Sequence, residues 1–143
     1  IVFKAKEPES LLAEDGKRED TEFVSEMCEL MKTNPKSVKS ITRLGKINKE
    51  KTVIAGPRPM KIELDDAKSK AIFMSNLRNL STAEVKYKEV SVVHDMTMKE
   101  RQLNKEQIRM AKEKNDGNES GDFIYLVRGP PWKRKIVSVK VKK

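Results

Sequence analysis

The residues whose types and spacing could do chemistry are most concentrated in the segment Arg128-Gly-Pro-Pro-Trp-Lys-Arg134. It contains Trp132, the only tryptophan of the chain, directly before the triplet Lys-Arg-Lys. Residues 122–143 hold seven basic residues and one acidic residue, Asp122, a net charge of +6. An indole beside lysine and arginine can stack on a nucleobase while the cations hold phosphates. The alternative is that Trp132 folds back and fills a small core, as buried tryptophans often do.

A second set of cations is expected on a β-sheet. Residues 38–44 and 60–64 alternate in polarity, which predicts two strands. We expect Lys39 and Arg43 on the outward face of the first strand and Lys61 on that of the second. An open basic sheet is a known surface for single-stranded RNA, although the aromatic residues that stack on bases there are almost absent here. Alternatively, these three cations are simply solvated strand positions.

The elements that must position these residues begin with the order strand, helix, strand, strand, helix, strand. This order predicts an α+β, ferredoxin-like (βαββαβ) fold, with a four-stranded antiparallel sheet and two helices, as in the RNA-recognition motif. Many proteins unrelated to RNA share that fold. A charged helix and a β-hairpin follow. We therefore expect an RNA-recognition-motif-like domain over 1–93 and a small C-terminal subdomain over 94–143.

The bounds of these elements follow from periodicity and from capping residues. The expected strands are Ile1–Ala5, Val38–Leu44, Met60–Leu64, one that starts near Tyr87 and contains Val90 and Val92, Phe123–Val127 and Lys135–Val141. The expected helices run from Asp20 or Thr21 to Lys32, from Asp65 or Asp66 along the stripe Ala67, Ala71, Met74, Leu77 and Leu80, and from Asp95 or Thr97 to Lys114. Residues 7–16 and the segment from Lys46 to Pro59 are expected to be loops, and the direction of Phe3 is left open.

Composition narrows the class of partner. The chain has 31 Lys and Arg against 22 Asp and Glu, a net charge of +9, which suits a polyanion without requiring one. No segment approaches the roughly 20 apolar residues of a membrane-spanning helix, and no apolar signal region precedes the first strand. The single Cys28 indicates a reducing compartment, so we expect an intracellular protein of the cytoplasm or nucleus. Because the chain starts at Ile1, we expect it to be a piece of a longer protein.

Catalytic and metal-binding patterns are weak. The chain contains neither a phosphate-binding Gly-rich loop nor a Gly-x-Ser-x-Gly turn, and one His with one Cys cannot form a zinc finger. His94 beside Asp95 could be an oriented base, but a strand end followed by a helix cap is favoured. The pair Asp65-Asp66 is interpreted as a helix start, and Cys28 as a packing residue. We expect no enzyme activity, no metal and no cofactor.

Four motifs then occur in a characteristic order: Thr42-Arg-Leu-Gly-Lys46, Arg58-Pro-Met-Lys-Ile62, Val93-His-Asp-Met-Thr97 with Lys99-Glu-Arg101, and Phe123-Ile-Tyr-Leu-Val-Arg-Gly-Pro-Pro-Trp132. In this order they resemble the RNA-binding region of the first-open-reading-frame proteins of LINE-type, non-LTR retrotransposons, over nearly the whole chain. The resemblance implies two domains that clamp single-stranded nucleic acid, with roles in RNA packaging and as a nucleic-acid chaperone. It also implies that Arg43 and Lys46, Arg58 and Lys61, and the Arg128–Arg134 loop face a shared cleft. No coiled-coil heptads occur here, so any self-association is placed outside this chain.

The leading hypothesis is a non-catalytic, sequence-tolerant module for single-stranded RNA or DNA, in a ribonucleoprotein. Its candidate binding residues are Lys39, Arg43, Lys46, Arg58, Lys61, Arg101, Arg128, Trp132, Lys133 and Arg134. Two alternatives remain open: a protein-interaction domain of the same fold, and a non-catalytic flanking piece of a reverse transcriptase or endonuclease polyprotein.

Overall fold

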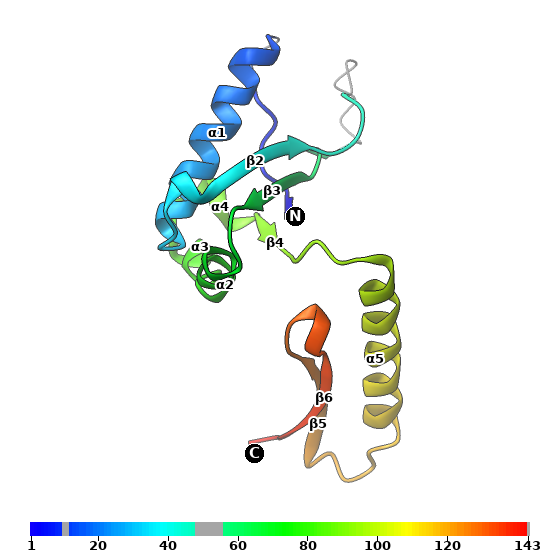
Figure 1. Cartoon of the computed structure of the whole chain (residues 1–143). Coiled ribbons are helices and arrows are strands. Elements are labelled where there is room, and N and C mark those ends of the chain that lie inside the picture. The colour runs from blue at the N-terminus through cyan, green and yellow to red at the C-terminus, as the bar shows by residue number, and fades with distance from the viewer. Residues whose placement is uncertain (10–11, 48–55, 143) are drawn as a thin grey trace. The chain divides into compact units, whose positions relative to one another are not determined.

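A computed structural model describes residues 1–9, 12–47 and 56–142. The chain forms two compact units, Ile1–Val93 and His94–Lys143, which are drawn together in Figure 1. Within the described ranges, none of the helices has both the length and the apolar character needed to cross a membrane. The first unit contains a four-stranded sheet, and the second contains a long helix and a two-stranded hairpin.

The first unit is an α+β fold whose four-stranded sheet is antiparallel throughout, with the strand order β2-β3-β1-β4. The expected α+β class and antiparallel sheet are therefore confirmed. The strands are β1 (Val2–Phe3), β2 (Val38–Arg43), β3 (Met60–Leu64) and β4 (Ser91–Val92).

The predicted bounds of the first and last strands of this unit, β1 and β4, were wrong. β1 does not extend to Ala5, because Lys4 has a φ of 61°, outside the extended conformation. β4 does not begin near Tyr87, because Tyr87 lies in a short helix and packs into the core.

Helices cover one face of this sheet. They are α1 (Ala13–Leu30), α2 (Ala67–Ser75), α3 (Asn79–Thr82) and α4 (Val85–Lys88), with a 3-10 turn, η1 (Pro35–Ser37), before β2. α1 begins well before the expected cap at Asp20 or Thr21, and Gly16 lies inside it rather than in a loop. Two acidic residues in its first turn, Glu14 and Asp15, favour a helix start there because they interact with the positive end of the helix dipole.

The core lies between the helices and the inner face of the sheet. Met27, Cys28 and Met31 at the end of α1 are fully buried, together with Met60 of β3. Cys28 thus has the packing role that was expected, and burial raises the pKa of its thiol to about 11. The apolar stripe expected on the second helix was partly wrong, because Ala67 and Ala71 are exposed and Phe73 is buried instead. Its other members, Met74, Leu77 and Leu80, do contact the core.

Strand β2 contains an irregularity that decides where its cations point. The register with β3 shifts between Val38 and Ser40, so that Val38 and Ile41 both contact the core. A bulge of this kind adds one residue to a strand and reverses the faces of everything beyond it. Ser40 and Thr42 are therefore on the outer face, and Arg43 is on the inner one, opposite to the simple alternation.

The second unit contains α5 (Met98–Asp116) and a hairpin of β5 (Phe123–Arg128) and β6 (Lys135–Lys140), joined through the 3-10 turn η2 (Pro131–Lys133). These elements agree closely with the predicted ones. The helix cap is Thr97, which forms a reciprocal capping box with Glu100.

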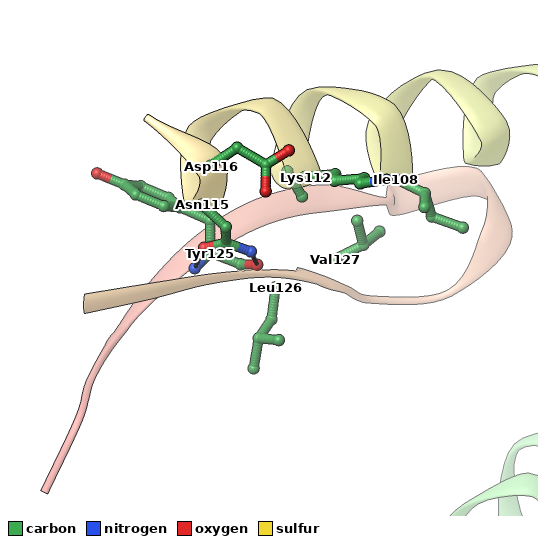
Figure 2. Close-up of a pocket in the computed structure, with 8 residues that line it drawn as sticks. Ile108, Lys112, Asn115, Asp116, Tyr125, Leu126 and Val127 are labelled. Carbon is green, nitrogen blue, oxygen red and sulfur yellow. Dashed lines mark hydrogen bonds between the residues drawn. The ribbon is translucent and has the colours of Figure 1, made fainter. Parts of the chain in front are cut away.

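The helix packs on one face of the hairpin. Asn115 of α5 fixes the contact, because its side chain accepts a hydrogen bond from the backbone N–H of Tyr125 at 2.7 Å and donates one to the carbonyl of the same residue at 2.9 Å. Figure 2 shows Tyr125 and Val127 on the helix side of β5 and Leu126 pointing away from the helix. The shallow hollow drawn there, between Ile108 and Val127, belongs to this packing seam.

Candidate nucleic-acid interface

The loop between β5 and β6 presents Trp132 at the surface. Its neighbour Pro131 is fully buried and anchors the turn, and the N–H of Lys133 donates to the carbonyl of Pro130 at 2.9 Å. With its backbone held in this way, Trp132 is 62% exposed. Of the two interpretations of this residue, the surface position is therefore the one observed, and Trp132 does not fill the core of the second unit.

The indole of Trp132 has one aromatic neighbour of its own unit. The ring of His94 lies 5.7 Å from it, centroid to centroid, with an interplanar angle of 78°. An edge-to-face arrangement of this kind is a preferred geometry of aromatic pairs. His94 therefore supports the side chain of Trp132.

Four basic residues in and beside the loop of this hairpin lack an acidic partner in the described part of the chain. Arg128, Lys133 and Lys135 are exposed, and no ion pair joins them or Arg134 to an acidic residue in the described part of the chain. The Nε of Arg134 is buried and forms no hydrogen bond within the described residues. These cations therefore create a local positive field that the protein itself leaves uncompensated.

Arg43, unlike these cations, has an acidic partner, and the prediction that its side chain points outward was wrong. Its side chain is 7% exposed and pairs with Asp20 of α1, which is 13% exposed, at 2.7 Å. Its Nε also donates to Asp20 at 3.1 Å, and its two terminal nitrogens donate to the carbonyls of Ala5, Lys6 and Arg58 at 2.9, 2.7 and 2.9 Å. All five N–H donors of this guanidinium are thus used inside the first unit. Arg43 stabilises the fold and has no donor left for a ligand.

Arg58 is likewise compensated within the first unit. Its Nε and Nη2 each donate to the carboxylate of Glu7 at 3.0 Å, a bidentate pair, and its backbone N–H donates to the same group at 2.7 Å. Burial alone would raise the pKa of Glu7, but the hydrogen bonds from Arg58 and the charge of Arg43 outweigh it and lower the pKa. The carboxylate is therefore ionised at neutral pH and neutralises Arg58.

The outer face of the sheet is open but weakly basic. Lys39 and Lys61 are both exposed there, as expected. Glu63 lies beside them: Lys39 donates to it at 3.3 Å, and hydrogen bonds from Lys39 and Ser40, with the charge of Lys61, lower the pKa of its carboxyl group. Phe3, whose direction the sequence left open, is 38% exposed. The face thus offers one aromatic ring and two partly compensated lysines.

Two candidates remain, Lys46 in the first unit and Arg101 in the second. Lys46 is exposed and follows Gly45, which lies beyond the end of β2 and has a φ of 94°. Arg101 lies on α5 and is 3.8 Å from Asp95, an exposed pair that contributes little stability. Residues 48–55 of the expected loop lie outside the described residues.

No known family, curated protein or solved structure matches this chain. The assignment of a role therefore depends on the geometry above. In the described residues there is also no group of three or more His, Cys, Asp or Glu side chains placed to hold a metal ion.

Two features of the site were missed at the level of sequence. Lys135 was treated as a strand residue, whereas it lies directly opposite Arg128 in the hairpin. The strands expected from the sequence, Phe123–Val127 and Lys135–Val141, differ in length and therefore did not pair these two residues. The second missed feature is that Asp20 and Glu7 neutralise Arg43 and Arg58. No sequence pattern indicated these pairs, because Asp20 was expected to be a helix cap and Glu7 to lie in a loop.

Proposed function

We propose that the chain is a non-catalytic module that binds single-stranded RNA or DNA with little sequence preference, and that its main contact surface is the 128–135 loop region. The observation that carries this proposal is the exposed Trp132 among four cations without acidic partners in the described residues. Aromatic stacking is tolerant of base identity, and phosphate contacts are indifferent to it. Such a surface suits single strands, whose bases are free to stack.

The fold of the first unit supports the same proposal. Its elements follow the order β-α-β-β-α-β, with two short extra helices before β4, and its sheet order is β4-β1-β3-β2 when taken from the other edge. We take this unit to be ferredoxin-like and similar to the RNA-recognition motif. With the ordered motif series of the sequence, it supports assignment to the first-open-reading-frame proteins of LINE-type retrotransposons, in an intracellular ribonucleoprotein.

Substitution of Trp132 tests the proposal. We expect Trp132→Ala to weaken binding of a single-stranded oligonucleotide by about 1–3 kcal/mol, the loss typical of one stacked base. Circular dichroism should show no loss of fold, because this side chain is largely exposed. The measurement is a filter-binding titration of the full chain.

The control variant is Trp132→Phe, which keeps a smaller aromatic face and is expected to retain most of the affinity. Equal binding by the alanine variant and the natural chain would contradict a stacking role for Trp132.

One observation favours a second candidate, a protein-interaction surface. On the face of the hairpin turned away from α5, the side chains of Ile124 and Val139 lie opposite each other and are 44% and 43% exposed. Exposed aliphatic side chains of this kind are common in protein interfaces. This candidate predicts no saturable nucleic-acid binding at physiological salt, so the same titration separates the two.

A further inference from the structure

Arg128 and Lys135 form the last cross-strand pair of the hairpin, directly before the loop that presents Trp132. Because side chains alternate along a strand, Arg128 shares the face of Leu126, which points away from α5 in Figure 2. Residues directly opposite each other in an antiparallel pair have Cβ atoms about 4.5–5.5 Å apart, and like charges there destabilise the hairpin. The hairpin thus holds two positive charges together at its loop end.

Lys39, which also lies on a strand, differs from Arg128 and Lys135 because it has an acidic partner. Lys39 of β2 has a carboxylate on the neighbouring strand, that of Glu63, at 3.3 Å. Arg128 and Lys135 have no ion pair with any acidic side chain in the part of the chain that is described, and the neighbouring Arg134 has a buried Nε without an acceptor there. An anion bound from solution would convert this repulsion into attraction.

We infer that Arg128 and Lys135 together bind one phosphate group of a nucleic-acid backbone, which rests on the function proposed above. A guanidinium offers two parallel donors to phosphate oxygens, and an ammonium adds a mobile point charge. The two side chains reach the phosphate from opposite strands. Because the same loop presents Trp132, the phosphate site and the stacking surface belong to one structural element.

Neutral variants test this site through two independent readouts on the full chain. The first is the midpoint of thermal unfolding followed by the fluorescence of Trp132, the only tryptophan, which lies in the second unit. Without ligand, Arg128→Gln and Lys135→Gln are each expected to raise this midpoint by about 1–5 °C, because either one removes the repulsion. The double variant gains little more, since the repulsion is already gone.

The second readout is binding of a single-stranded RNA oligonucleotide at several salt concentrations. Each single variant is expected to bind about ten-fold more weakly, the effect of one lost charge-assisted hydrogen bond. In the double variant the slope of log K against log salt becomes shallower by about 0.7, the contribution of one phosphate on a single strand. Variants that bind more weakly yet are more stable distinguish a ligand site from a structural one.

Lys140→Gln is the matched control. Lys140 lies on the same strand opposite Phe123, on the other face of the hairpin, and is expected to change neither readout. If the natural chain binds RNA and the Arg128 and Lys135 variants bind equally well, the phosphate site is wrong and the proposed function stands. A slope change near 1.4 in the double variant would show two separate phosphates and contradict the shared site. If the natural chain itself does not bind, both proposals fail.

Discussion

Replacing Arg43 with methionine is expected to lower the free energy of unfolding of the first unit by about 3–5 kcal/mol. Methionine has a similar length but leaves the carboxylate of Asp20, itself only 13% exposed, without its partner. It also leaves the carbonyls of Ala5, Lys6 and Arg58 without the donors that now reach them. Chemical denaturation followed by circular dichroism measures the loss.

The control for this variant is Lys39→Met on the same strand. Lys39 is exposed and its pair with Glu63 is worth at most about 1 kcal/mol, so this change is expected to be nearly neutral for stability. Equal stability of the two variants would contradict the structural role assigned to Arg43. If an Arg43 variant that remains folded binds RNA more weakly, Arg43 contacts the ligand and its assignment as a purely structural residue is wrong.

Replacing Gly129 with alanine is expected to destabilise the second unit by about 3 kcal/mol or more. Gly129 has a φ of 99°, which L-amino acids rarely adopt, and a Cβ there would lie 2.5 Å from the backbone oxygen of Lys133. Backbone atoms cannot yield as a flexible side chain can, so the loop must rearrange. Unfolding is monitored by the fluorescence of Trp132, which lies in this unit.

Gly121 supplies the matched comparison for that prediction. It also has a positive φ, 63°, but a Cβ there meets no atom within 4 Å. Gly121→Ala is therefore expected to cost only about 1–2 kcal/mol, the strain of the left-handed conformation alone. Similar losses for the two alanine variants would contradict the close approach between Gly129 and Lys133.

The second unit could be predicted well because its structure is encoded locally. The apolar, β-prone runs in Phe123–Arg128 and Lys135–Lys140, the two prolines in the connection and the candidate caps Asp95 and Thr97 are all visible in neighbouring residues. The exposure of Trp132 was not predictable in this way. It depends on Pro131, which takes the buried position in the turn.

The first unit was harder because contacts distant in sequence decide its details. The bulge in β2 arises in the pairing with β3, and it moves Arg43 from the expected outer face to the inner one. There it meets Asp20 of α1, which the sequence had offered as a helix cap. The prediction of four strands was correct, but the direction of the Arg43 side chain could be known only from the register between β2 and β3.

These basic residues therefore form two groups, those that are paired with a carboxylate of the protein and those that are not. Arg43, Arg58 and Lys39 each have a carboxylate partner within the first unit. The cations at 128 and 133–135 have none in the described residues and flank the exposed Trp132 along the sequence of the hairpin loop. Net charge alone could not make this distinction, because it counts both kinds equally.

The salt dependence of single-stranded RNA binding by the unmodified chain tests the central claim most directly. If these four cations hold two or three phosphates, with Arg128 and Lys135 sharing one of them, the slope of log K against log salt is about −1.4 to −2.1. Affinity then falls about 7- to 18-fold between about 50 mM and 200 mM salt. An affinity that stays nearly constant over this range, or an absence of saturable binding at its lower end, would contradict the account.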